Sequence, residues 1–137
     1  MRFLFQLIEA VKEEDFFKTN EVLSLITQDD DFAGYIRPLL LFMEDNPDVD
    51  YGMPGPLVHY MERYYMYGYE ELLYESVNRK PTIHTLWMLN RVINSQRLVN
   101  KDKYLALLEK VSKDTNQSNI VRNEASQYMQ YQKSQGE

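Results

Sequence analysis

Between Tyr51 and Ser95, apolar residues recur at the three- and four-residue spacing that places them on one face of an α-helix. Glycine and proline divide this stretch into three segments, which follow the turn at residues 54–56, Gly68 and Pro81. The rest of the chain keeps the same spacing, and no segment shows the alternation that is typical of a strand. The sequence therefore predicts an all-α protein.

We expect roughly seven to eight short antiparallel helices, arranged either as HEAT-like helical hairpins or as a compact bundle. Asp30 or Asp31 is a good N-cap for the third helix, and Gly68 is placed to end the fourth. The 137 residues fit a single helical domain, residues 1–137, and we expect disorder in about the last five. The expected helical ranges are 1–13, 15–27, 32–44, 56–68, 69–78, 81–93, 101–112 and 119–132.

The formal net charge of −6 is unevenly distributed along the chain. Residues 1–90 carry 7 Lys/Arg against 16 Asp/Glu, whereas residues 91–137 carry 8 against 5. An acidic surface repels the phosphates of nucleic acids and attracts basic proteins, so we expect no direct nucleic-acid binding. A net charge of a few units is also ordinary for a small soluble domain, so charge alone identifies no partner.

The chain has no cysteine, which excludes disulfides, thiolate metal ligands and a cysteine nucleophile. Its start has one arginine and a short apolar run that Glu9 interrupts, so we expect an amphipathic helix there rather than a signal peptide. No uninterrupted apolar run approaches the roughly 20 residues that a membrane span needs. We therefore expect a soluble cytoplasmic protein that does not associate with membranes.

The two histidines give little support for a metal site or for catalysis. His59 and Glu62 share a helix face, but the Glu-x-x-His order of bundle metal sites is reversed and further ligands are missing. We interpret His59 as hydrogen-bonded near the Pro-Gly turn. No nucleophile motif surrounds Ser76 or Ser95, the serines considered as partners of His84. We expect no catalytic residue, no metal, no cofactor and no enzymatic activity.

An acidic loop and a cluster of tyrosines are the candidate partner-binding features. The loop at residues 45–55 is longer than most helix connections, and long loops are often functional. Seven of the 11 tyrosines lie between residues 51 and 74. Exposed tyrosines beside carboxylates are typical of protein interfaces, although half-buried positions at helix crossings explain them equally well. The predicted partner-binding residues are Asp45, Asp48, Asp50, Tyr51, Tyr64, Tyr65 and Tyr67.

The stretch from Tyr51 to Ser95 resembles small bacterial immunity proteins of polymorphic and contact-dependent toxin systems. The resemblance implies an all-helical domain that binds and neutralises one cognate toxin domain in the cytoplasm, as in toxin–antitoxin pairs and contact-dependent growth inhibition. The resemblance is carried by residues 55–59, 69–70, 79–82 and 87–94. Among these, the residues to which we assign a structural rather than a binding role are Pro56, His59, Pro81, Trp87 and Asn90.

Many toxin domains are basic nucleases, and an acidic, tyrosine-rich surface is suited to cover one. Complementary charge speeds association, and buried aromatic anchors slow dissociation. We therefore expect an immunity protein whose partner is a cognate toxin domain, a basic nuclease being one candidate. The alternative is a helical-repeat adaptor or scaffold that binds another protein or a peptide. The sequence does not determine the oligomeric state.

Overall fold

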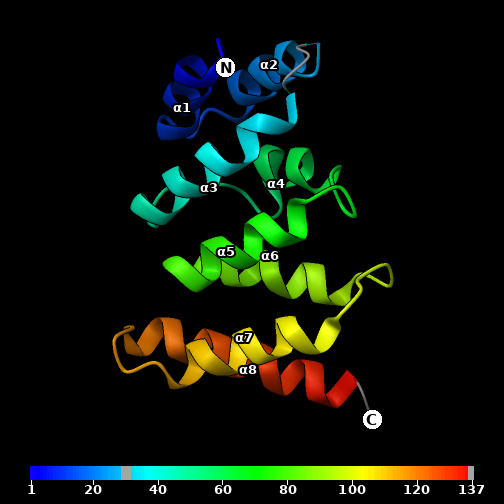
Figure 1. The fold of residues 1–137 in the computed structure, drawn as a ribbon. Coiled ribbons are helices and arrows are strands. Elements are labelled where there is room, and N and C mark those ends of the chain that lie inside the picture. The colour runs from blue at the N-terminus through cyan, green and yellow to red at the C-terminus, as the bar shows by residue number, and fades with distance from the viewer. Residues whose placement is uncertain (29–31, 136–137) are drawn as a thin grey trace. The chain divides into compact units, whose positions relative to one another are not determined.

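The structure is a computed structural model that describes residues 1–28 and 32–135, and every regular element in those ranges is helical (Figure 1). The prediction of an all-α protein is confirmed. The last helix continues to Gln135, past its predicted end at residue 132, and the disorder predicted for residues 136 and 137 lies outside the described residues. The elements are α1 (Leu4–Lys12), α2 (Phe16–Ile26), the 3-10 helix η1 (Phe32–Tyr35), α3 (Ile36–Asp45), α4 (Gly55–Glu62), α5 (Tyr69–Arg79), α6 (Ile83–Asn94), α7 (Lys101–Lys113) and α8 (Asn119–Gln135).

The chain divides into two compact units, Met1–Leu72 and Leu73–Glu137, and the boundary falls within α5. The same boundary separates the charges. The first unit carries 15 Asp/Glu against 5 Lys/Arg, a formal charge of −10, and the second carries 6 against 10, a charge of +4. The acidic character of the protein therefore belongs to the first unit. The prediction that residues 1–137 form a single domain stays a prediction.

In the first unit, α1 and α2 form a hairpin, and α2 also packs on α4. The start of α1 is fastened to η1, because the Tyr35 hydroxyl accepts a hydrogen bond from the Phe3 N–H at 3.2 Å. The apolar faces that the sequence predicts for α1, α2 and α3 supply the buried core. Its members from these helices and α4 are Leu7, Val11, Val22, Leu23, Ile26, Ile36, Leu39, Leu40, Met43, Leu57, Val58 and Met61.

The fourth helix is shorter than the sequence predicts. It ends at Glu62 rather than at Gly68, because the backbone bonds that follow join residues three apart, as in Tyr64 N–H to Met61 O at 2.9 Å. Met66 then takes a left-handed conformation with φ 71°, and its N–H donates to the Glu70 carboxylate at 2.6 Å. These turns end the α-helix before the glycine is reached.

Two other predicted helix starts differ from the structure. The third helix begins as η1 and becomes α-helical only at Ile36, and its predicted caps, Asp30 and Asp31, lie outside the described residues. Pro81 is not the first residue of α6, because Thr82 behind it is the N-cap. Thr82 Oγ1 accepts from the Thr85 N–H, and Thr85 Oγ1 accepts from the Thr82 N–H, each at 3.1 Å. This reciprocal capping box fixes the start of α6.

In the second unit, α7 and α8 pair as an antiparallel hairpin, and α6 packs on both (Figure 1). A polar contact joins α8 to α6: the Gln132 Nε2 donates to Asn90 Oδ1 at 2.7 Å and to Asn94 Oδ1 at 2.8 Å. Gln132 is only 4% exposed, so both of its amide hydrogens are satisfied inside the protein. The apolar residues buried in α6, α7 and α8 are Leu86, Met88, Leu89, Val92, Ile93, Leu107, Leu108, Val111 and Ala125.

Candidate partner-binding surface

The loop between α3 and α4 is held by its own tyrosine. Tyr51 is 2% exposed, and its hydroxyl donates to the Asn46 carbonyl at 2.6 Å. Burial of the phenol raises the pKa of Tyr51 well above its usual value. The Asn46 side chain in turn donates to the Phe42 carbonyl at 2.9 Å, which fastens the loop to the end of α3. Tyr51 therefore shapes the loop from inside, and its predicted place on an exposed binding surface is not supported by its burial.

The three aspartates predicted in this region, Asp45, Asp48 and Asp50, are all exposed. The backbone N–H of Asp50 donates to Glu14 Oε2 at 2.7 Å, so the loop is attached to the turn between α1 and α2. Glu13 and Glu14 of that turn are also exposed. The structure thus brings carboxylates from two segments together, and only one of those segments is predicted from the sequence as part of the site.

Glu14 occupies an unusual backbone position. It has φ 57°, in the left-handed region where a helix most often ends on glycine. The Asp15 N–H bonds to the Ala10 carbonyl at 3.1 Å and the Glu14 N–H to the Val11 carbonyl at 3.0 Å, which is the hydrogen-bond pattern of a Schellman motif. Asp15 then caps α2 by accepting from the Lys18 N–H at 2.9 Å. A glutamate at this position keeps the carboxylate that binds the loop, which glycine would lose.

We call Glu13, Glu14, Asp15, Asp48 and Asp50 the acidic corner. Two large apolar side chains from the same two segments are exposed: Phe17 at 76% and Met53 at 73%. Their chain neighbours Phe16 and Gly52 lie close together, since a Cβ added to Gly52 would lie 3.5 Å from Phe16 Cε2. Carboxylates beside exposed apolar side chains are a combination that protein interfaces use.

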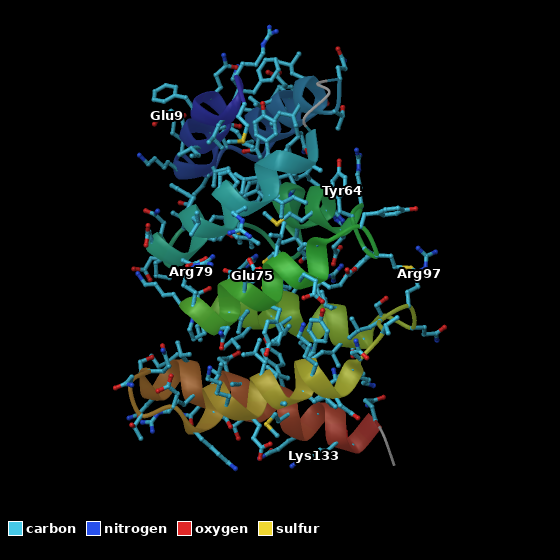
Figure 2. The ribbon with its side chains drawn as sticks, in the orientation of Figure 1. Glu9, Tyr64, Glu75, Arg79, Arg97 and Lys133 are labelled. Carbon is cyan, nitrogen blue, oxygen red and sulfur yellow. The ribbon has the colours of Figure 1, made fainter. Side chains whose placement is uncertain are left out.

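The predicted tyrosines Tyr64, Tyr65 and Tyr67 do not belong to this corner. The acidic loop leads into α4 and the tyrosine-bearing turn follows it, so a helix of 8 residues, about 12 Å long, separates the two. In Figure 1 the end of α3 and the turn after α4 lie on opposite sides of the first unit, and Figure 2 shows Tyr64 on the latter side. The single acidic, tyrosine-rich surface predicted from the sequence is therefore divided in two.

The three tyrosines of this turn also differ in burial. Tyr64 is buried and packs edge-on against Tyr60, with ring centroids 5.7 Å apart, and burial raises the pKa of its phenol. Tyr65 is half-buried, and its hydroxyl donates to Glu62 Oε2 at 3.1 Å. Tyr67 is 82% exposed. Of these three, only Tyr67 presents most of its ring to a partner.

The two histidines have different surroundings. His59 is exposed rather than hydrogen-bonded at the Pro-Gly turn, and its Nδ1 lies 4.0 Å from Glu62 Oε1. No group of three or more possible metal ligands occurs among the described residues. His84 stacks at a tilt on Trp87, with ring centroids 5.2 Å apart, and the Arg91 guanidinium lies 5.1 Å from the Trp87 ring centroid.

Comparison with known proteins finds no match for this chain among protein-family models, curated proteins or solved structures. Within the described parts of the chain, no helix combines the length and the apolar character needed to cross a membrane. The immunity function therefore stays an expectation from the sequence resemblance. The acidic corner is the structural feature that bears on partner binding.

Proposed function

We propose that the protein is a bacterial immunity protein that acts in the cytoplasm, without catalysis, by binding a cognate toxin domain through the acidic corner. The observation that carries the proposal is the attachment of the acidic loop to the α1–α2 turn, where Glu14 Oε2 accepts the Asp50 N–H at 2.7 Å. That bond gathers carboxylates from two segments on a unit whose formal charge is −10. A basic protein, such as a nuclease toxin domain, is the partner that such a surface attracts.

The exposed apolar residues give the proposed surface its second component. Charge at the rim of an interface mainly accelerates encounter, whereas buried aromatic and apolar anchors slow dissociation. Phe17 and Met53 are the anchors in this proposal, since both are largely exposed and each lies within three residues of a carboxylate of the acidic corner in the sequence. The partner is expected to cover them, and their exposure in the unbound protein is then accounted for.

The test begins with co-expression of the full chain and the C-terminal domain of a large secreted protein encoded next to it. We expect the two to co-purify and the chain to restore growth to cells that express the toxic domain. If the domain is toxic and the chain neither binds it nor restores growth, the immunity proposal is wrong. Binding without rescue would instead favour the adaptor or scaffold alternative.

The surface is tested with two variants that change the net charge equally. Glu13→Gln/Asp48→Asn removes two carboxylates of the acidic corner, and Glu9→Gln/Glu21→Gln removes two that pair with lysines elsewhere on α1 and α2. We expect the first variant to slow association with the toxin domain by about 3- to 10-fold at low ionic strength, and the second to leave it nearly unchanged. Equal rates for the two variants would place the interface elsewhere.

A further inference from the structure

A polar hollow of about 300 Å³ lies between α2 and α4, and no residue of the acidic corner lines it. Its volume is at the lower end of the range for small-molecule sites. One wall is the face of α2 that carries Asn20 and Ser24 and continues to Thr27. The facing wall is formed by His59 and by Arg63, the C-cap of α4. The floor is formed by Leu23, Pro56 and Tyr60.

The α4 wall supplies one positive charge, the guanidinium of Arg63, beside the imidazole of His59. His59 and Arg63 are one helical turn apart, so both side chains project from the same face of the helix. The Arg63 guanidinium forms no hydrogen bond or ion pair with any described residue, whereas Lys12 and Lys18 of the same unit pair with Glu9 and Glu21. A guanidinium that lines a cavity and has no partner among the described residues is suited to a ligand carboxylate or phosphate, which it can bind with two parallel hydrogen bonds.

The α2 wall supplies hydrogen-bond acceptors. The Ser24 hydroxyl donates its proton to the Asn20 carbonyl at 3.0 Å, and the Thr27 hydroxyl donates its proton to the Ser24 carbonyl at 2.8 Å. Because both protons are used within the helix, the two hydroxyl oxygens, which belong to residues that line the hollow, remain available only as acceptors. Acceptors of this kind pair with hydroxyl groups of a ligand and not with its anionic end.

We propose that this hollow binds a small phosphomonoester that also carries hydroxyl groups, such as a sugar phosphate. The phosphate lies against Arg63 and His59, and the ligand hydroxyls donate to Ser24 and Thr27. An isolated phosphate ion fills only a small part of about 300 Å³, which is why a larger polyol phosphate fits better. The negative charge of the surrounding unit opposes binding over long range, but physiological salt screens it beyond about 8 Å, while the Arg63 contact is direct. This site is independent of the proposed immunity function.

The test uses the full chain, titrated with glucose 6-phosphate, glucose and inorganic phosphate and followed by amide chemical shifts and calorimetry. We expect glucose 6-phosphate to shift the amides around residues 20–27 and 56–63, and to bind at least about 10-fold more tightly than either of the other two probes. No shift from glucose 6-phosphate at about 10 mM would overturn the proposal, and equal binding of glucose would show that no phosphate is recognised.

Variants separate the two walls of the site. Arg63→Gln should weaken glucose 6-phosphate binding by about 10-fold or more, and Lys12→Gln, with the same change of charge on α1, should leave it unchanged. Ser24→Ala should weaken glucose 6-phosphate binding without affecting the weak binding of inorganic phosphate, since only the ligand hydroxyls contact this side chain. An Arg63→Gln protein that is folded and binds glucose 6-phosphate as the wild type does would show that the guanidinium is not the anion site.

Discussion

The contact of Gln132 with Asn90 and Asn94 makes the most direct prediction about stability. Gln132→Ala removes two hydrogen bonds, of 2.7 and 2.8 Å, that join α8 to α6 within the second unit. Each is expected to contribute about 0.5–1.5 kcal/mol net. The two acceptors differ, because Asn94 is exposed and its oxygen can return to water, whereas Asn90 is half-buried and its oxygen loses a partner. Most of the cost is therefore expected from the Asn90 bond.

The side-chain stem adds a packing term. Gln132 is 4% exposed, so the alanine substitution also removes the buried Cγ methylene, worth about 0.8 kcal/mol. We expect Gln132→Ala to lower the free energy of unfolding by about 2–3 kcal/mol, and the hydrogen bonds to supply most of that loss. Gln132→Met keeps the stem and loses only the amide, and we expect it to cost about 1–2 kcal/mol. The difference between the free energies of unfolding of the two variants separates the packing contribution from that of the hydrogen bonds.

Urea unfolding followed by circular dichroism measures these differences, and hydrogen exchange of the α8 amides localises them. Gln130→Ala, at an exposed position of the same helix, is the control and should change the stability by less than about 0.5 kcal/mol. A double-mutant cycle with Asn90→Ala should give a coupling of about 0.5–1.5 kcal/mol. A Gln132→Ala protein as stable as the control, or a cycle with no coupling, would refute the assignment of this contact as a link between α6 and α8.

Three tyrosine substitutions give further predictions. Tyr51→Phe should destabilise the protein in urea by about 1–2 kcal/mol, because the Asn46 carbonyl loses its donor, while Tyr67→Phe at an exposed site should have almost no effect. Burial, with the nearby Glu124 carboxylate, raises the pKa of Tyr128 to about 12, so the folded protein holds this proton at pH values where the unfolded chain, with an ordinary phenol near pH 10, releases it. The contribution of Tyr128 to the free energy of unfolding should therefore be fully present below about pH 10 and be lost as the pH rises toward about 12. Tyr128→Phe should reduce this loss in denaturation curves measured between these two pH values.

Sequence periodicity predicts the helices well where both ends carry polar residues. The seventh helix was expected at residues 101–112 and runs from Lys101 to Lys113, because Asn100 and Asp114 bound a strongly amphipathic segment. The predicted end of α4 is wrong because tertiary packing, and not local spacing, decides where this helix stops. Tyr64 and Tyr69 are both buried, and the chain between them turns tightly and passes through a left-handed Met66. Local spacing does not contain that information.

The candidate surface shows a related limit. Residue type predicts that Asp48 and Asp50 are exposed, because carboxylates are rarely buried without a partner. It does not tell whether a tyrosine points outward, and Tyr51 points inward to the Asn46 carbonyl. Glu13 and Glu14 belong to the candidate surface because Glu14 contacts Asp50, which lies 36 residues further along the chain. A local sequence pattern cannot predict such a contact. The sequence Glu13-Glu14-Asp15 indicates a helix boundary, but it does not indicate which other segment lies beside that boundary.

The carboxylates of the acidic corner are not equivalent, and this decides how the binding proposal has to be tested. Glu14, Asp15 and Asp50 each accept a backbone N–H, at 2.7, 2.9 and 2.9 Å, so they hold the hairpin and the loop in place whatever else they bind. Replacing any of them would alter the fold locally, and a loss of partner binding would then have two explanations. Glu13 and Asp48 are exposed and accept no backbone N–H from any residue that the structure describes, so their charge can be removed while the backbone stays as it is. Association measured with these two residues changed therefore reports on the electrostatic surface, and on little else.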